Sequence, residues 1–347
     1  MNSFAPQTPQ QLAEALHTLA TEHHSIRLGG NFSKDRLGGA PQPADACLSM
    51  REMRRLLEYD PRDLTISVEA GMPFAELEQI LAEQRQMLPL DPGWRGSTVG
   101  GVVAANLSGP RRRLYGTARD MIIGMKFATL EGKLVQSGGM VVKNVAGLDM
   151  AKLMVGSFGT LAAIATVNFK VFPMPVESRS FAMSFAAARE AFAKRDAILQ
   201  SVLQPAAIDI VNWPDGFRLL IRAQGNAAVL DRFARELPEA SVVDESTWDE
   251  IREFTPNFLE TNPQGSVIAH SMKLSEMAEA MAKLGVPAIA RAGSGVIYAH
   301  YRRNAGAHYS ENALSQEWSG DFAMMEKIKQ MLDPEHLLNR GRLFGRI

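Results

Sequence analysis

Apolar residues near the start of the chain recur first at helical spacing and then as a short strand. Leu12, Leu16 and Leu19 fall on one face of a helix that Thr8 can cap, because residues three and four apart share a helical face. Residues 25–34 then predict a short strand that runs into a glycine turn. The spacing therefore predicts a helix followed by a strand and a tight turn.

The next part of the chain repeats this change of period. Leu64, Ile66 and Val68 alternate with polar residues and predict a strand, and a helix follows from Pro73. Residues 91–139 predict a turn, a helix of small residues, a loop and a β-hairpin. The pattern thus predicts helices and strands in mixed order.

Pro173 and Pro175 mark a change of pattern. Before them, residues 149–156 predict a short helix and residues 159–173 a strand pair or one long buried strand. After them, helices alternate with strands up to a final helix and a basic tail. Because 347 residues are long for one core, the sequence predicts three parts: residues 1–174, residues 175–310 as a small α/β domain, and residues 311–347 returning to the first part.

Composition and charge narrow the class of protein. The net charge is −1 and the pI about 6.7, so no electrostatic argument favours nucleic acid. The single cysteine, Cys47, excludes an internal disulfide framework and suits a reducing compartment. Residues 153–169 are apolar but interrupted by glycine, threonine and asparagine, which does not suit a bilayer helix. The first residues lack the pattern of a secretory signal, so we expect a cytoplasmic protein with no membrane span.

The common nucleotide and metal motifs are missing from the sequence. No G-x-x-x-x-G-K-[ST] occurs, and the segment at residues 293–298 lacks the third glycine of G-x-G-x-x-G. No H-E-x-x-H, C-x-x-C or paired histidine cluster suggests a metal ion. Neither a P-loop enzyme nor a simple Rossmann dehydrogenase is supported, and no metal site is expected.

Glycine-rich turns stand out at residues 29–30, 97–109 and 156–160. Glycine permits positive φ and lets backbone N–H groups approach a ligand, so such loops can cradle phosphates. Each loop taken alone is equally consistent with a tight turn of an ordinary α and β protein. The interpretation therefore depends on whether the loops act together.

Taken together, the loops resemble the FAD-binding domain of the vanillyl-alcohol oxidase (PCMH-type) flavoprotein family. Residues 27–33 are similar to its R-G-G-x-x-S loop, and residues 97–109 to its second FAD loop. Residues 147–161 resemble the pattern G-x-D-x-x-x-L-x-x-G-S-x-G-T-L, and residues 333–342 the closing D-P-x-x-x-x-N-P-G-K. The motifs occur in the family's order and cover most of residues 20–172 and the end of the chain.

The resemblance implies an α+β fold, with a two-subdomain FAD-binding domain and a small α/β cap domain. FAD is expected to be bound non-covalently, because Asn31 stands where members with covalent flavin carry histidine. Arg340 replaces the proline of the closing motif. This substitution bears on the turn that faces the flavin ring in the family, and so on Asn339 as a contact of the flavin. The cofactor-binding residues that the resemblance implies are Arg27, Gly29, Gly30, Asn31, Phe32, Ser33, Pro92, Ser97, Thr98, Gly100, Gly101, Ala104, Asn106, Gly109, Gly147, Asp149, Gly156, Ser157, Gly159, Thr160 and Asn339.

Within this family, residues 91–161 are most similar to the FAD-binding subunits of bacterial glycolate oxidase, which oxidises glycolate to glyoxylate with several different subunits. This implies a homologous FAD-binding catalytic subunit and an iron–sulfur subunit as partners, with glycolate as substrate and peripheral attachment to the inner membrane through those partners. Two alternatives stay open: a self-sufficient FAD-dependent 2-hydroxy-acid dehydrogenase, and a flavin-binding assembly subunit without redox work.

Residues for substrate chemistry are less evident. Oxidation of a 2-hydroxy acid needs an arginine for the carboxylate and a base for the hydroxyl proton. Relatives resembling D-lactate dehydrogenases carry paired histidines in a large cap, and this chain shows no such pair. His300 and Arg302 are the candidates, with a structural or surface histidine of the cap domain as the alternative.

Other polar and aromatic residues allow more than one interpretation. Residues 111–113 are three arginines that could bind a phosphate or an acidic partner, or form a solvated loop. Trp248 and Trp318 lie in polar surroundings, either as packed anchors or as parts of an interface.

Overall fold

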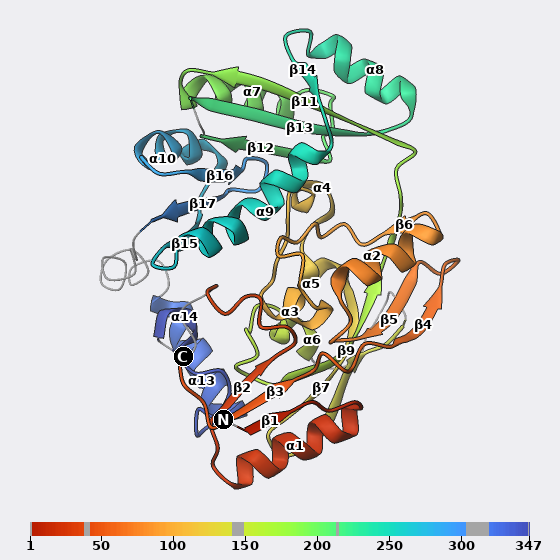
Figure 1. The fold of residues 1–347 in the computed structure, drawn as a ribbon. Coiled ribbons are helices and arrows are strands. Elements are labelled where there is room, and N and C mark those ends of the chain that lie inside the picture. The colour runs from red at the N-terminus through yellow and green to blue at the C-terminus, as the bar shows by residue number, and fades with distance from the viewer. Residues whose placement is uncertain (1, 38–41, 141–148, 213–214, 303–318, 346) are drawn as a thin grey trace.

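The computed structural model describes residues 2–37, 42–140, 149–212, 215–302, 319–345 and 347. Figure 1 shows two bodies: a lower one that contains both ends of the chain, and an upper one built from the middle of the sequence. The lower body carries the glycine loops, and the upper body, called the cap below, is built from residues 177–301. Helices and strands are mixed in both, so the fold is α+β.

The lower body contains two main sheets. The first is parallel, with the order β1-β3-β2. The second is antiparallel, with the order β4-β5-β9-β7-β8. Their strands are β1 (Asn2–Phe4), β2 (Ile26–Gly29), β3 (Ala46–Ser49), β4 (Leu56–Asp60), β5 (Thr65–Glu69), β7 (Ile122–Ala128), β8 (Leu134–Gly138) and β9 (Ala163–Lys170).

The first helix forms where the sequence predicts it. In α1 (Pro9–Thr21), Thr8 accepts a hydrogen bond from the Gln11 backbone N–H, and Leu12, Leu16 and Leu19 are buried. The smaller elements of this body are α2 (Phe74–Glu83), β6 (Gln86–Met87), α3 (Val99–Ala104), α4 (Arg112–Tyr115), α5 (Ala118–Met121), α6 (Met150–Met154) and β10 (Phe172–Pro173). The predicted hairpin is β7 with β8. The segment after Gly159 forms the strand β9 and the separate β10, which pairs with β6 rather than with β9.

The cap contains a seven-stranded sheet with the order β14-β11-β13-β12-β16-β17-β15. Every pairing in it is antiparallel, so the alternating helices and strands form an antiparallel sheet with helices on its faces. Its strands are β11 (Glu177–Phe185), β12 (Ala207–Val211), β13 (Phe217–Gly225), β14 (Ser241–Val243), β15 (Ser266–Ser271), β16 (Ala288–Arg291) and β17 (Val296–Tyr301), and its helices are α7 (Ala188–Gln200), α8 (Ala227–Glu236), α9 (Ser246–Thr261), η1 (Leu274–Glu276) and α10 (Met277–Lys283).

The two faces of the cap sheet have separate cores. On one face, Phe181 and Ile221 pack with residues of α7, α8 and α10. On the other face, Ala182 and Leu220 pack with Trp248 of α9, as the alternation of side chains along β11 and β13 requires. Trp248 is therefore a packed anchor, whereas Trp318 lies outside the described residues. The helix α9, which carries Pro256 within it, was not predicted from the sequence.

The end of the chain returns to the lower body, as Figure 1 shows. Helix α13 (Ser319–Leu332) leads to an isolated parallel bridge between Leu338 and Ile26 of β2, and α14 (Arg342–Gly345) follows. The C-terminal motif is thus placed directly beside the first glycine loop, 311 residues away in sequence from its partner Leu28.

Candidate functional site

A pocket lies where the glycine loops of the lower body meet. It is lined by residues from the turn after β2, the start of α3, the loop before β9 and the C-terminal motif. The predicted residues that it brings together are Gly29, Gly30, Asn31, Phe32, Ser33, Thr98, Gly100, Gly101, Ala104, Gly159 and Asn339. Gly156, Ser157 and Thr160 line an adjoining pocket, which shares Phe158 and Arg342 with the first.

The first loop turns sharply after β2. Phe32 adopts a left-handed conformation, with φ of 53°, and its ring lies under the Arg27 guanidinium at 4.6 Å from the ring centroid. A Cβ atom on Gly29 would overlap the Phe32 ring, and one on Gly30 would overlap Thr98. Within the described residues, the backbone N–H groups of residues 31–34 donate no hydrogen bond to protein, so they remain available to a ligand.

The second loop is held mainly by packing between protein segments. Thr98 caps α3 by accepting a hydrogen bond from the Gly101 N–H at 3.3 Å, and Ser97 donates to the Trp94 carbonyl at 2.6 Å. A Cβ atom on Gly100 would lie 2.8 Å from Ala70 Cβ, and one on Gly109 would overlap backbone atoms of Asp91. Close approach of protein explains these two glycines. A Cβ atom on Gly101 would lie 3.2 Å from both Lys34 Nζ and Thr98 Oγ1, which belong to the pocket lining.

The third loop is joined to α3 by backbone hydrogen bonds. The Phe158 N–H donates to the Ala104 carbonyl at 2.8 Å, and the Gly156 N–H donates to the Val103 carbonyl at 3.2 Å. Gly156 and Gly159 have φ of 82° and 69°, a region that favours glycine. These two positive-φ turns and the two hydrogen bonds to α3 place the third loop at the wall of the same pocket.

Asn339 connects three segments of the site. Its Nδ2 donates to the carbonyl oxygens of Leu28 at 2.9 Å and Phe158 at 2.7 Å, and its Oδ1 accepts from the Leu28 N–H at 2.7 Å. These bonds join β2, the third loop and the C-terminal motif. The side chain of Asn339 thus builds the pocket wall, and its polar atoms are already engaged with protein.

The pocket is electropositive. Lys34 and Asp35 line it together with Arg342, and Asp35 is paired with both Arg27 and Arg342. Lys34, Arg342 and Asp35 give the lining a net charge of +1, and Arg27 next to it raises the total to +2. Burial lowers the pKa of Lys34 to about 8, because the charged ammonium is poorly solvated there. Lys34 and Arg342 were not predicted as site residues, although Lys34 directly follows the last residue of the first motif.

Some predicted residues do not line this pocket or the adjoining one. Arg27 lies behind Phe32, and Asp149 caps α6 and pairs with Lys152 at 3.0 Å. The others outside the two linings are Pro92, Ser97, Asn106 and Gly109. Gly147 lies outside the described residues.

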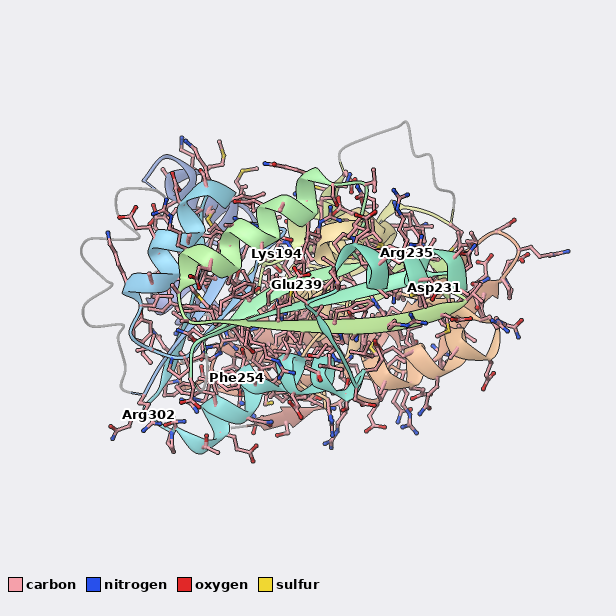
Figure 2. All side chains as sticks on the ribbon, turned by 90° about the horizontal axis from the view of Figure 1, so that it is seen from above. Lys194, Asp231, Arg235, Glu239, Phe254 and Arg302 are labelled. Atoms are coloured by element: carbon pink, nitrogen blue, oxygen red, sulfur yellow. The ribbon has the colours of Figure 1, made fainter. Side chains whose placement is uncertain are left out.

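His300 and Arg302 lie in the cap, apart from the pocket. His300 is 0% exposed; its ring bonds Thr255 at 2.9 Å and the Pro287 carbonyl at 3.1 Å, and burial lowers its pKa to about 4. Arg302 borders a wide groove of the cap together with Phe254, and Figure 2 places it at the periphery of the molecule. His300 is therefore a buried histidine that packs within the cap, and the alternative of a surface histidine is wrong.

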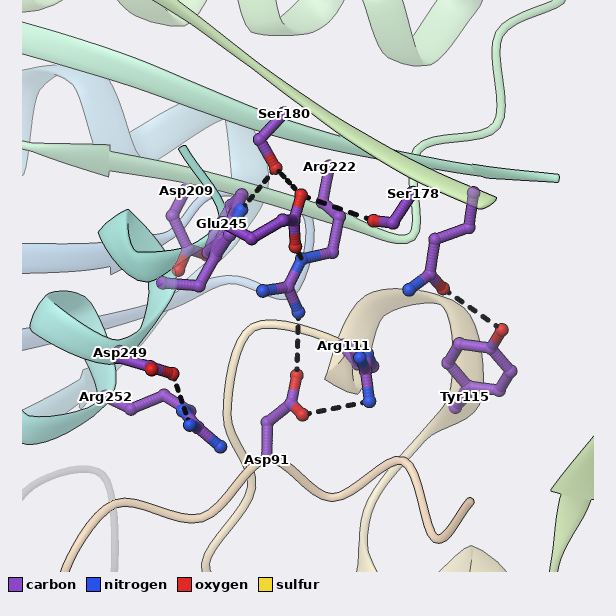
Figure 3. A network of polar contacts seen from close by, with 12 residues as sticks. Asp91, Arg111, Tyr115, Ser178, Ser180, Asp209, Arg222, Glu245, Asp249 and Arg252 are labelled. Carbon is purple, nitrogen blue, oxygen red and sulfur yellow. Dashed lines mark hydrogen bonds and ion pairs between the residues drawn. The ribbon is translucent and has the colours of Figure 1, made fainter. Parts of the chain in front are cut away.

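A network of charges joins the cap to the lower body (Figure 3). Asp91 accepts ion pairs from Arg111 at 3.1 Å and from Arg222 of β13 at 3.5 Å. Arg222 also pairs with Glu245 at 3.0 Å and lies over the Trp248 ring. Arg111, the first residue of the arginine run, is therefore held at the domain junction by its ion pair with Asp91.

Further arginines fix the same junction. Arg113 donates to the Pro205 carbonyl of the cap at 3.0 Å. Arg36, next to the pocket residues, donates to the Leu259 carbonyl at the end of α9 and to the carbonyls of Asn262, Pro263 and Gly265, at 2.9, 2.9 and 2.8 Å. One short segment, residues 31–36, thus both lines the pocket and contacts the cap.

The pocket is suited to FAD by its chemistry. FAD carries a doubly charged pyrophosphate between two planar ring systems, and the site offers unused backbone N–H donors and a net positive charge. The C-terminal motif closes the pocket beside apolar residues such as Ala162 and Ile164. The donors and charges fit the pyrophosphate, so the fold and the site define a flavin-binding protein.

Comparisons with known proteins agree with this class. Residues 3–138 match the family model described as FAD binding domain. The chain is 30% identical to the glycolate oxidase subunit GlcE of Escherichia coli (strain K12), over 97% of this chain and 98% of that protein. It is 27% identical to the glycolate oxidase subunit GlcD of Bacillus subtilis (strain 168), over 61% of this chain and 45% of that protein. The chain belongs to the family of FAD-linked oxidoreductases that includes GlcE.

Solved structures show the same fold. An alkyldihydroxyacetonephosphate synthase superimposes with a TM-score of 0.76 at 17% identity, covering 97% of this chain and 75% of that one. A 4-ethylphenol oxidase from Gulosibacter chungangensis gives a TM-score of 0.74 at 14% identity, covering 99% and 89%. Among the described helices, none combines the length and apolar character that crossing a bilayer requires.

Proposed function

We propose that this chain is the FAD-carrying subunit of a glycolate oxidase complex. The observation that carries the proposal is its similarity to GlcE along almost the full length of both chains, together with an electropositive pocket built by this chain's glycine loops. The bound flavin would supply a two-electron acceptor. Residues 1–174 and 311–347 would hold it, and residues 175–310 would form the cap.

The protein's own residues would act in binding and positioning. The N–H groups of residues 31–34 would donate to the pyrophosphate, with Thr98 at the start of α3 beside them. Asn31 Nδ2 donates to the Gly96 carbonyl at 3.0 Å, and an amide forms no covalent bond to flavin, so the cofactor would be held non-covalently. Acid precipitation should then release all of the flavin into the supernatant.

The contacts at the domain junction favour a subunit that transfers electrons over a dehydrogenase that binds the substrate by itself. Three arginines of the lower body near the junction are already engaged: Arg111 with Asp91, Arg113 with the Pro205 carbonyl, and Arg36 with the end of α9. Binding of a hydroxy-acid carboxylate by any of them would require a change of partner. We therefore assign substrate binding to a homologous FAD-binding subunit and electron acceptance to an iron–sulfur subunit, through which the complex would attach to the membrane from the cytoplasm.

The test compares the isolated chain with the assembled complex. Each is loaded with FAD and mixed anaerobically with glycolate, and bleaching of the flavin absorbance is followed. We expect bleaching in the complex and none in the isolated chain. Rapid bleaching of the isolated chain would establish the self-sufficient dehydrogenase instead, and a complex that forms but never reduces this chain's flavin would support the assembly role.

A further inference from the structure

Lys34 is a partly buried cation without a countercharge of its own. In the described part of the chain it forms no ion pair, and its only hydrogen bond is to Ser33 Oγ at 3.1 Å. It projects toward the start of α3, where a Cβ atom on Gly101 would lie 3.2 Å from its Nζ. Burying an ammonium in this way is unfavourable unless a ligand compensates for it.

The charges around Lys34 do not supply that compensation. Asp35, the next residue, is shared between Arg27 and Arg342. Ser33 and Thr98 contribute hydroxyl groups that stay neutral at any working pH. Behind Arg27, burial raises the pKa of the Cys47 thiol, so this group adds no negative charge near neutral pH. The surroundings of Lys34 are thus neutral or positive.

We propose that Lys34 is the countercharge of the FAD pyrophosphate and makes loading of the cofactor dependent on pH. The inference rests on the proposed function in taking FAD as the ligand. The pyrophosphate is the anionic part of FAD, so an ammonium in this pocket can pair only with it. The neighbouring N–H groups of residues 31–33 would share the same oxygens and fix their position.

The direction of the pH effect follows from the position of Lys34. In the free protein its pKa is lowered to about 8 by burial, and a bound dianion raises that pKa again. Below pH 8 Lys34 is already charged and the affinity for FAD should not change with pH. Above pH 8, Lys34 must take up a proton when FAD binds, so the affinity for FAD falls. If the pKa of Lys34 in the complex returns to about 10.5, the affinity decreases by about 30-fold between pH 7 and pH 9.5.

The experiment measures FAD binding to the apoprotein by quenching of flavin fluorescence at pH 7 and pH 9.5. The variants are Lys34→Met, Lys34→Arg and the matched control Lys133→Met, which removes a lysine 71% exposed in the β7–β8 turn. We expect Lys34→Met to weaken FAD binding about ten- to hundred-fold at pH 7, the range for a lost charge-assisted hydrogen bond. Lys34→Arg should bind without the pH dependence, because arginine stays charged.

Riboflavin provides a second readout, since it has the same ring and no pyrophosphate. Lys34→Met should bind riboflavin as the wild type does, and riboflavin binding also reports any titration of the ring itself. Wild-type affinity of Lys34→Met for FAD, or unchanged pH dependence in Lys34→Arg, would overturn the proposal while FAD binding stands. Failure of the wild-type chain to bind FAD at all would overturn the proposed function as well.

Discussion

The buried pair of Lys329 and Asp333 allows a quantitative test of how the C-terminal motif holds the pocket. The two side chains are 1% and 0% exposed and are paired with each other. Lys329 also donates to the carbonyls of Thr160 at 2.8 Å and Leu338 at 3.2 Å. This one ammonium therefore ties α13 to the third glycine loop and to the residue before Asn339.

Substituting Asp333→Asn keeps the shape and removes the charge. The carboxylate also accepts hydrogen bonds from the Leu337 and Leu338 N–H groups, each at 2.8 Å, and one amide oxygen cannot serve all of these donors. Breaking a buried ion pair from one side typically costs about 3–5 kcal/mol. We expect that loss in the free energy of unfolding, because burial disfavours the charge of Lys329 once its partner is gone.

The assay is urea unfolding at pH 7 followed by circular dichroism, with the midpoint and slope compared between variants. Asp149→Asn is the matched control: its partner Lys152 is also a lysine, three residues away, but the side chains are 53% and 40% exposed. Because asparagine can still cap α6 and exposed pairs contribute little, the control should lose less than about 1 kcal/mol. Equal losses in the two variants would refute the account of the closing motif.

Two further predictions concern the cap. Arg36→Ala removes the donors that hold the end of α9, so amide hydrogen exchange should speed up at residues 258–265 and not in α8; unchanged exchange would mean that Arg36 does not fix the junction. Burial lowers the pKa of His300 from 6.5 to about 4. Between these pH values the imidazole is protonated in the unfolded chain and neutral in the folded protein. The free energy of unfolding therefore decreases as the pH falls from 6.5 to 4. The loss should approach about 3 kcal/mol and be missing in His300→Gln, as unfolding at pH 7 and pH 4.5 will show.

Much of the lower body could be predicted from local sequence. The helix with Leu12 and Leu16, the strand with Ile66 and Val68, and the β7–β8 hairpin follow from spacing and turn residues that act over a few positions. The loops that the glycine motifs named come together in the fold, and most of their residues line one pocket. The physical role of Gly100 differs from expectation, because its contact is with Ala70 of a distant segment.

The rest depends on contacts that a local pattern does not contain. Lys34 is unusual because the fold pairs its neighbour Asp35 with two arginines instead, and Arg36 is important because α9 ends beside it. Asn339 reaches Leu28 across 311 positions of sequence. His300 looked like a candidate base as an isolated polar residue, whereas its surroundings in the cap make it a buried structural group.

The most direct test of the central claim is a titration of the apoprotein with FAD, comparing wild type, Gly101→Gln and Gly139→Gln. Gly101 lies in α3 and its side chain would extend toward Lys34 and Thr98, while a Cβ on Gly139 meets nothing within 4 Å. We predict one tightly bound FAD in the wild type and in Gly139→Gln, and loss of binding in a folded Gly101→Gln protein. Wild-type binding by Gly101→Gln would contradict the assignment of this pocket to FAD.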